Sequence, residues 1–262
     1  MNKPLRVILN ADDFGYSQET VEATIECFEK GALTSATIMA NMPATGQAIA
    51  YALGHPQFSF GAHLTYVDEV PLSNPAHIPA LVTPEGRFRL SQEVRLAALR
   101  CQIPMDQIVT ETTAQLSLLR DAGVPLSHVD SHGHLHKFRP FVNALRSALP
   151  RFGISRLRSV QDVYVQRPLK SPTYWCGFAW RRRIKAAFST TDHFAMPACD
   201  EPEGWCELIL QRAGRGVLEV GVHPGYAEAW RNCQRVGIVA FHAAASRVGC
   251  RFITWDDVPM HQ

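Results

Sequence analysis

The stretch that most constrains the fold lies near the start of the chain, where a short apolar run ends in two adjacent carboxylates and a glycine. Residues 5–9 are apolar except for Arg6, and Asp12, Asp13 and Gly15 follow closely. A buried strand that delivers acids to its C-terminal end, before the chain turns out, has this pattern. Active sites of parallel α/β folds are built where strands lead into helices. The stretch therefore predicts such a fold, with a site at the end of its first strand.

The rest of the chain alternates between strand-like and helix-like segments. We expect helices over residues 17–30, 44–53, 91–100, 105–122, 140–149, 203–212 and 234–248. We expect strands over residues 5–11, 34–41, 58–64, 125–129, 156–160, 191–194, 217–222 and 251–255. This alternation predicts the α/β class, as a single-domain distorted (β/α) TIM-like barrel with parallel strands spanning residues 1–262. The length suffices, because such barrels need about 250 residues.

Composition excludes several other classes of protein. The hydrophobic fraction of 46% and the charged fraction of 19% are typical of soluble globular proteins, and the net charge of +2 gives no reason to expect a nucleic-acid partner. The seven cysteines are scattered and include no C-x-x-C pair, which argues against a disulfide framework. We expect a cytoplasmic location, because little chain precedes the first strand and the cysteine pattern suits a reducing compartment.

Two segments depart from the alternating pattern. Residues 66–90 are rich in proline and form a long irregular connection, which predicts a lid-like insertion or a rim that contacts substrate. Residues 160–190 form a basic segment rich in aromatic side chains. Between Arg151 and Lys185 the sequence has nine basic residues and only one acid, Asp162. Either its apolar stripe packs on the barrel and its arginines are solvated, or the segment contacts anionic lipid or a lipid-linked glycan.

Ligand-type side chains stand at the ends of four predicted strands. Asp12 and Asp13 follow the first strand, His63 lies at the end of the third, Asp130 and His132 follow the fourth, and His223 follows a later strand. Polar groups at the C-terminal ends of barrel strands converge on one mouth. Aspartate and histidine are the ligands expected for a divalent metal that keeps open positions for water and substrate. A single histidine in a strand is more often a core residue, but four such coincidences predict a metal site.

The run Asp130-Ser131-His132-Gly133-His134-Leu135-His136 places a ligand-type residue at every second position. An extended chain would put all four on one face. Because Pro140 indicates a helix soon afterwards, we expect only His132, the histidine nearest the strand, to reach the metal. We expect Asp130, His134 and His136 to support the ligands or to contact substrate.

Four motifs together resemble a known family. Asn10-Ala11-Asp12-Asp13-Phe14-Gly15, Gly61-Ala62-His63-Leu64, the run from His128 to His136, and Glu219-Val220-Gly221-Val222-His223-Pro224 are similar to motifs of the YdjC-like carbohydrate deacetylases. That family includes chitooligosaccharide deacetylases and hopanoid-associated members. The resemblance extends from Arg6 to about Trp255. Chitooligosaccharide-type members carry a further histidine where this chain has Gly133, a departure that leaves the metal site intact and bears on sugar specificity.

The resemblance implies a hydrolase that removes N-acetyl groups from amino sugars, in an oligosaccharide or a glycolipid, and uses one divalent metal ion. By match to the family motifs, Asp13, His63 and His132 would hold the metal. Asp12 would be the general base, and His223 would protonate the leaving amine. Zn²⁺, Mn²⁺ or Co²⁺ suits two histidines and one aspartate, and an open, watery site would accept Mg²⁺.

Several alternatives remain open from the sequence. Arg158 either orients Asp12 or binds substrate, or is simply solvated, and the same choice applies to Asp192. The chain could be another metal hydrolase, a phosphoesterase or a cyclic amidohydrolase, if Asp130, His134 and His136 contribute to a second metal site. It could also be a sugar binder without turnover. The sequence does not determine the oligomeric state.

Overall fold

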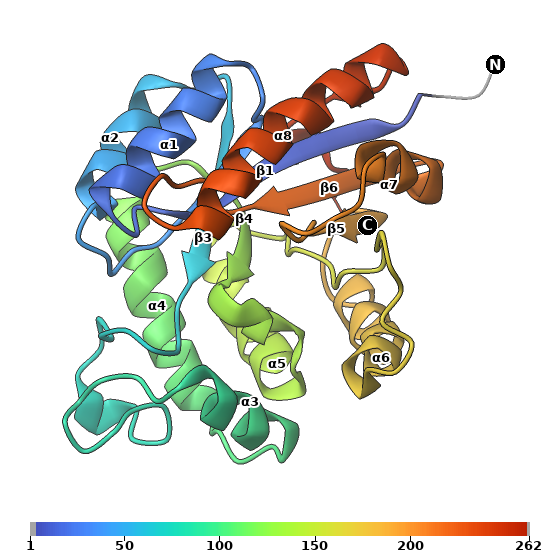
Figure 1. Cartoon of the computed structure of the whole chain (residues 1–262). Coiled ribbons are helices and arrows are strands. Elements are labelled where there is room, and N and C mark those ends of the chain that lie inside the picture. Colours follow the sequence, from blue (N-terminus) through green and yellow to red (C-terminus); the bar gives the residue numbers. More distant parts are fainter. Residues whose placement is uncertain (1–3, 261–262) are drawn as a thin grey trace.

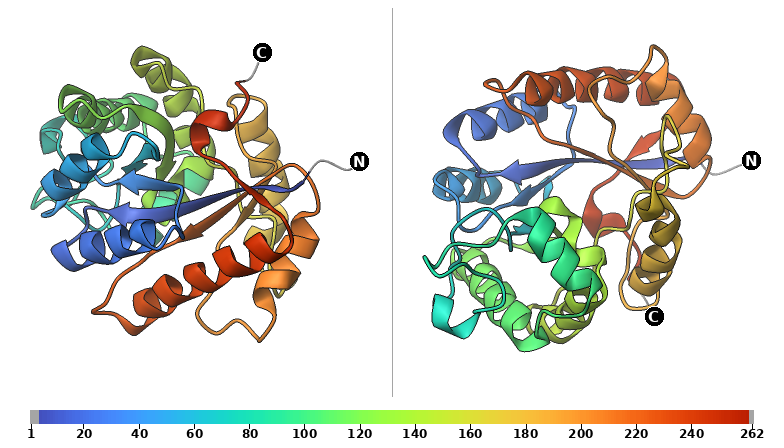
Figure 2. Two further views of the ribbon diagram at one scale, coloured as in Figure 1. Left: turned by 90° about the horizontal axis from the view of Figure 1, so that it is seen from above. Right: turned by 60° about the horizontal axis from the view of Figure 1, so that its bottom comes forward.

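The computed structural model describes residues 4–260, and it shows a parallel sheet surrounded by helices (Figure 1, Figure 2). The strands are β1 (Arg6–Phe14), β2 (Ser35–Ile38), β3 (Ser59–Leu64), β4 (Leu126–Ser131), β5 (His193–Ala195), β6 (Val217–Val222) and β7 (Arg251–Phe252). The α-helices are α1 (Gln18–Glu29), α2 (Thr45–Gly54), α3 (Ser91–Leu99), α4 (Met105–Asp121), α5 (Arg139–Ala148), α6 (Pro172–Lys185), α7 (Trp205–Ala213) and α8 (Ala229–Arg247). Four short 3₁₀-helices complete the set: η1 (Pro75–His77), η2 (His132–Lys137), η3 (Leu149–Phe152) and η4 (Trp255–Asp257).

The sheet curls into a distorted barrel, as the sequence predicts. Its strand order is β4-β3-β2-β1-β6-β5, and β7 pairs with the first residues of β1. All these pairs are parallel. Residues 155–163 connect the two edges, because Leu157 bridges Val129 of β4 and Val163 bridges Ala195 of β5. The C-terminal ends of the strands therefore surround one mouth.

The predicted strand over residues 156–160 is wrong, because this segment makes only isolated bridges. Arg156 pairs with Ser189, and Val163 pairs with Ala195. From the first bridge to the second, residues 156–163 advance by seven positions and the facing residues 189–195 advance by six. The two segments therefore lose register, and no continuous ladder of hydrogen bonds forms. Helix α8 begins at Ala229, earlier than the predicted residue 234. Helix α6 lies in the basic segment, outside the predicted helices, and begins at Pro172, where a proline suits the first turn.

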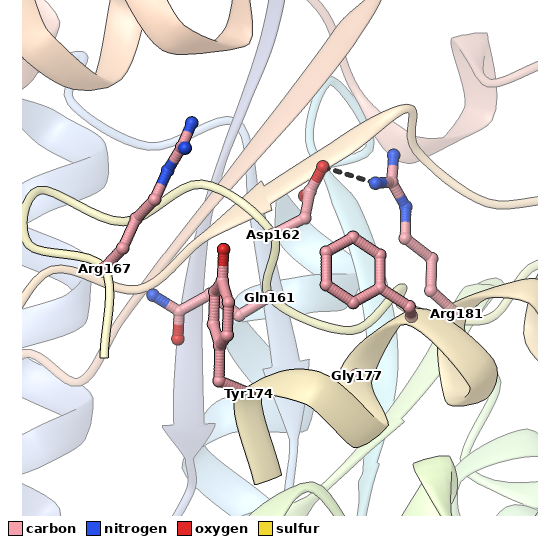
Figure 3. Close-up of a pocket in the computed structure, with 7 residues that line it drawn as sticks. Gln161, Asp162, Arg167, Tyr174, Gly177 and Arg181 are labelled. Carbon is pink, nitrogen blue, oxygen red and sulfur yellow. Dashed lines mark ion pairs between the residues drawn. The ribbon is translucent and has the colours of Figure 1, made fainter. Parts of the chain in front are cut away.

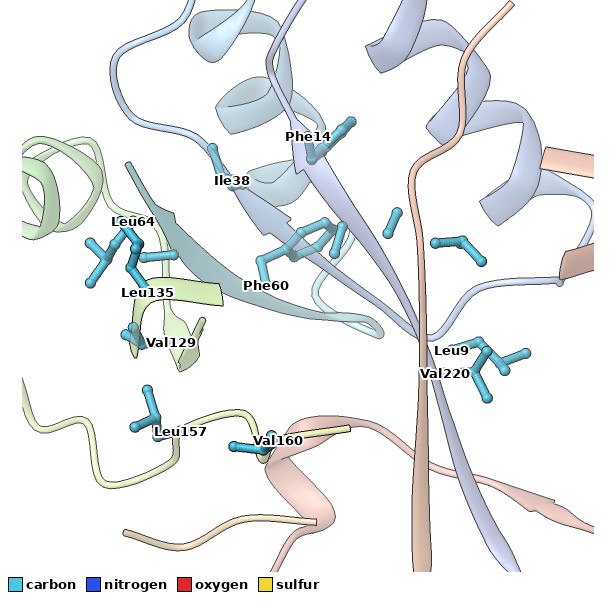
Figure 4. Close-up of a cluster of buried hydrophobic side chains, with 14 of the residues drawn as sticks. Leu9, Phe14, Ile38, Phe60, Leu64, Val129, Leu135, Leu157, Val160 and Val220 are labelled. Carbon is cyan, nitrogen blue, oxygen red and sulfur yellow. The ribbon is translucent and has the colours of Figure 1, made fainter. Parts of the chain in front are cut away.

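One cluster of buried apolar side chains extends from Leu5 to Ala245, which supports the proposed single domain. Figure 4 shows its centre, where Phe14 of β1 lies beside Phe60 of β3, and Leu9 of β1 lies beside Val220 of β6. Every residue of β1 except Arg6 is buried. A strand covered on both faces needs this near-continuous apolar composition, so a polar residue in β1 has a specific partner.

The irregular segment over residues 66–90 is held firmly against α4. The buried carboxylate of Glu111 accepts hydrogen bonds from the backbone N–H groups of Leu72 (3.0 Å) and Ser73 (2.9 Å). Near its ends, the N–H of Phe88 donates to the carbonyl of Glu69. The segment is thus an anchored loop, and its action as a lid stays a prediction.

Within residues 4–260, no helix combines the length and the apolar character that crossing a bilayer requires. All seven cysteines are free thiols in this structure.

Candidate active site

A local irregularity in β1 brings both of its carboxylates to the barrel mouth. Successive side chains of a regular strand point to opposite faces, so Asp12 and Asp13 would normally diverge. The pairing of β1 with β2 loses register between Ala11 and Phe14, and Asp13 has a left-handed backbone with φ of 57°. A β-bulge of this kind redirects a side chain. Both carboxylates consequently face the mouth and are buried.

Asp13, His63 and His132 form a compact cluster of ligand atoms at this mouth. The Oδ1 atom of Asp13 lies 3.2 Å from Nε2 of His63 and 3.0 Å from Nδ1 of His132. Metal–ligand bonds of about 2.0–2.2 Å place neighbouring ligand atoms about 3 Å apart. His132 is partly exposed, so one side of the cluster remains open. Among the described residues, this geometry fits a site for one divalent cation.

The carboxylates around His63 favour a positive charge at this cluster. Its Nδ1 atom lies 2.7 Å from Asp130, and its buried Nε2 atom faces the cluster without a hydrogen-bond partner among the described residues. Burial lowers the pKa of His63, but Asp130 and Asp13 outweigh burial and raise it to about 10. If Nδ1–H donates to Asp130, the Nε2 lone pair is directed at the position of a metal, as in carboxylate–histidine–metal arrangements.

Arg231 restrains the other oxygen of Asp13. Its Nη2 donates to Oδ2 of Asp13 at 2.8 Å, and its Nε donates to Glu228 at 2.7 Å. Burial raises the pKa of Asp13, but the adjacent imidazoles of His132 and His63 outweigh burial and hold the pKa well below its usual range. Asp13 is therefore ionised, with Oδ1 directed toward the histidines.

Asp12 is held by a buried arginine. Arg158 donates from Nη1 to Oδ2 of Asp12 (2.5 Å) and from Nη2 to Oδ1 (2.7 Å), and Asn10 adds a bond of 2.9 Å to Oδ1. Burial raises the pKa of Asp12, but the charge and hydrogen bonds of Arg158 outweigh it and hold the pKa far below the usual range. The structure thus places Arg158 as an orienting partner of Asp12, and excludes the solvated alternative.

Arg158 also faces two further buried carboxylates. Its Nε donates to Glu219 at 2.8 Å, and its Nη1 forms a short ion pair with Asp130. Burial raises the pKa of Glu219 to about 7, although Arg158 opposes the shift. Three acids thus share one guanidinium. Asp12, His63 and Asp130 also lie close enough to bind a metal together, but Arg158 already supplies the cation at that point.

His223 follows β6 and lies beside Asp12, with Nε2 3.9 Å from Oδ2 of Asp12. Its backbone N–H (2.7 Å) and its Nδ1 (3.0 Å) both contact Oε1 of Gln234, whose Nε2 donates to the carbonyl of Pro197. This last bond fixes the amide with its oxygen toward His223. Nδ1 therefore carries a proton, and Nε2 is directed toward the mouth.

The remaining predicted site residues separate into two groups. The chain turns sharply in η2, where Gly133 and His134 adopt left-handed backbones, so His134 and His136 leave the ligand cluster as expected. Asp192 is wrongly predicted as a site residue: its carboxylate accepts from the N–H of Val217, at the N-terminal end of β6, away from the mouth.

Sequence analysis missed Glu219, Arg231 and Gln234. A signal existed for Glu219, because a charged residue inside the apolar strand Val217–Val222 needs a buried partner. Arg231 and Gln234 lie in the first turns of α8 and belong to no motif, so only the fold brings them to Asp13 and His223.

Comparison with known sequences identifies relatives over most of the chain. A profile of the YdjC-like protein family matches residues 6–247. A carbohydrate deacetylase of Brevibacillus brevis is 30% identical over 227 residues, covering 86% of this chain and 83% of the relative. A carbohydrate deacetylase of Listeria monocytogenes is 32% identical over 226 residues, with coverage of 86% and 83%.

Comparison with solved structures shows the same fold. An Enterococcus faecalis protein, provisionally named a cellobiose-phosphate cleavage protein, superposes with a TM-score of 0.80 at 19% identity, covering 98% of this chain and all of the other. A peptidoglycan N-acetylglucosamine deacetylase gives a TM-score of 0.52 at 11% identity, covering 97% and 87%. The profile match and the sequence identities establish that this chain belongs to the YdjC-like protein family.

Proposed function

We propose that the protein is a metal-dependent hydrolase that removes N-acetyl groups from amino sugars, in an oligosaccharide or a glycolipid, and releases acetate. The observation that carries this proposal is the cluster of Asp13, His63 and His132 beside Asp12, a carboxylate outside the cluster that Arg158 holds. The sequence relatives named carbohydrate deacetylases support the same chemistry.

In this proposal, Asp13, His63 and His132 hold one divalent ion, of zinc, manganese, cobalt or magnesium. Such an ion polarises the acetamide carbonyl and makes its bound water more acidic. Asp12 accepts a proton from the attacking water, and Arg158 keeps Asp12 ionised and oriented for this step. Because Arg158 makes protonated Asp12 a strong acid, Asp12 releases that proton readily. His223 presents Nε2 to the mouth and protonates the leaving amine.

The binuclear phosphoesterase alternative has less support. A second metal would need Asp130, His134 or His136 as ligands. Arg158 occupies the position beside Asp130, and η2 carries His134 and His136 away from the cluster. The described residues thus favour one metal ion, and a bound phosphate ester would lack the second ion that commonly stabilises its charge.

A peripheral contact with anionic lipid or a lipid-linked glycan also remains a proposal. Trp180 and Ile184 of α6 are buried against the barrel, which supports the packing alternative for this stripe. On the other side of α6, Trp175 and Phe178 are exposed and stack on each other at 6.3 Å. Exposed aromatic rings beside arginines suit a membrane surface. The cytoplasmic location likewise stays a prediction.

Two asparagine substitutions test the division of roles. Asp12→Asn should keep the metal and lose about 10²- to 10⁴-fold in acetate release, because it removes a general base. Asp13→Asn should lose the metal itself. Acetate is measured across N-acetylated glycans and glycolipids, and metal content by elemental analysis. Metal loss in Asp12→Asn with retention in Asp13→Asn would reverse the assignments, and absence of acetate from every substrate would contradict the proposed function.

A further inference from the structure

A hollow of about 240 Å³ lies beside the candidate active site, between η2, the segment after Arg158 and α6. Phe194 connects the two regions: Arg158 lies over its ring at 4.8 Å, and the ring itself lines the hollow. His134, two residues after the ligand His132, also lines it and contacts the ring of Phe194 edge-on. A molecule whose reactive group lies at the metal cluster could therefore extend into this space.

The hollow contains a cation without a counter-charge. Lys137 lies over the rings of Phe138 (5.6 Å) and Trp180 (5.2 Å). Among residues 4–260, no carboxylate comes within ion-pair distance of its Nζ. Burial lowers the pKa of Lys137 to about 8, with repulsion from Arg95 adding to the effect. The ammonium group is nevertheless mostly protonated at neutral pH, so it is a partly desolvated charge that the protein itself does not neutralise.

His136 adds a hydrogen-bond donor to the same space. The hydroxyl of Ser131 accepts from the backbone N–H of His136 at 2.9 Å and lies 2.8 Å from its Nδ1. The hydroxyl proton has no other acceptor among the described residues, so it goes to Nδ1 and leaves Nε2 as an N–H group. That Nε2 is buried near the backbone of Ser159, without a well-formed hydrogen bond to any described residue. Burying an unmade donor costs free energy unless a ligand pairs with it.

A second hollow of about 250 Å³ continues the first, since Gln161 and Tyr174 line both (Figure 3). Asp162 neutralises Arg181 there through an ion pair of 2.6 Å, which Figure 3 shows as a dashed line. Arg167 lines the same hollow and has no carboxylate partner among the described residues. The lining therefore combines aromatic rings with excess positive charge, and it suits a ring-bearing ligand that carries a negative group.

We propose that Lys137 and His136 form an anion subsite that binds a carboxylate or phosphate on the part of the substrate remote from its acetamide. This inference rests on the proposed function, because it assumes that the acetamide lies at the metal cluster. The anion would neutralise Lys137 and accept from Nε2–H of His136. The adjoining rings of Trp180 and Tyr174 would contact the sugar.

The test uses three disaccharides containing N-acetylglucosamine: one neutral, one with a carboxylate and one with a phosphate. For the metal-loaded protein we expect kcat/KM for acetate release, and affinity by calorimetry, to favour at least one charged disaccharide by about tenfold or more, the range of a charge-assisted bond. In Lys137→Met this preference should fall to near unity. Arg146→Gln, which removes an exposed arginine of α5, is the matched control and should keep it.

A melting measurement separates binding from a structural role. Without ligand, Lys137→Met should melt at a higher temperature than the wild type, because it removes an unneutralised charge and keeps the apolar contact with Trp180. If Lys137→Met fails to fold, Lys137→Gln serves instead. The subsite would be overturned if the wild type showed equal kcat/KM and equal affinity for the three disaccharides. It would also be overturned if Lys137→Met kept the preference for a charged disaccharide. Binding preference without acetate from any disaccharide would uphold the subsite and contradict the proposed function.

Discussion

Arg158 and Lys137 are both cations near the barrel mouth, but their surroundings are opposite. Arg158 is fully buried and contacts Asp12, Asp130 and Glu219, so three acids surround one guanidinium. Lys137 lies over two aromatic rings and has no acid within ion-pair distance among the described residues. The first region has more negative than positive charge, and the second has the reverse.

The difference indicates which kind of group each region is prepared to receive. Surplus carboxylates around Asp13 and His63 favour a metal cation, and surplus ammonium and guanidinium groups beside α6 favour an anion. A ligand that joins an acetamide to a negative group would match both. The next four predictions test this contrast, in order of decreasing effect.

The largest effect is expected from Arg158→Met. It leaves three buried carboxylates without their cation, and breaking a buried pair in this way costs about 3–5 kcal/mol. We expect that loss in the free energy of unfolding, measured with urea at neutral pH. The matched control is Arg247→Met, whose ion pair with Glu207 is exposed on both sides, and which should cost about 0–1 kcal/mol. Similar losses for both would show that Arg158 is not the organising charge of the mouth.

A smaller effect is expected from Asp130→Asn. This change keeps the shape of the side chain but removes the charge that faces Nδ1 of His63. Partners that orient a metal ligand contribute about 10- to 100-fold in affinity. Metal titration should show that loss, while Asp121→Asn, an exposed change on α4, leaves affinity unchanged. An unchanged affinity in Asp130→Asn would remove Asp130 from the metal site.

The pH dependence of stability tests the uncompensated charge of Lys137. Its folded pKa of about 8 lies below the value of about 10.4 for an unfolded lysine. Between these values the unfolded state binds more protons, so folding stability rises with pH. The stability advantage of Lys137→Met should thus be largest below pH 8 and shrink toward pH 10.4. If the difference in stability between the wild type and Lys137→Met stays constant across this pH range, folding does not shift the pKa of Lys137.

The smallest effect is expected at the exposed face of α6. Binding to anionic vesicles should be weak, should fall with added salt, and should drop when Arg181, Arg182 and Arg183 become Ser. The control replaces Arg139, Arg146 and Arg151, three exposed arginines of α5 and η3, with Ser. Equal sedimentation of both variants, or none for the wild type at low salt, would favour the simple packing of α6 on the barrel.

Much of the fold could be predicted because it depends on local patterns. Ser17 caps α1 as its sequence position suggests, and the apolar runs of β1, β3 and β6 are buried strands. The segment over residues 156–160 was mispredicted, because the composition of a short segment does not reveal register, and register depends on the length of the facing segment. The prediction of Asp192 as a site residue was wrong for a related reason, because a polar residue beside a strand can lie at either end of the barrel.

The sequence by itself determined which side chains stand at strand ends, and its motifs indicated the family and, through that resemblance, the ligand set Asp13, His63 and His132 that is proposed for the metal. Strand ends meet at one mouth in any parallel barrel, so position along the chain was sufficient to expect a site there. Only the tertiary structure showed the bulge that turns Asp13 beside Asp12, the contacts of Arg231 and Gln234 from α8, and the unpaired charge of Lys137. These features depend on distances between segments far apart in sequence, which no local pattern encodes.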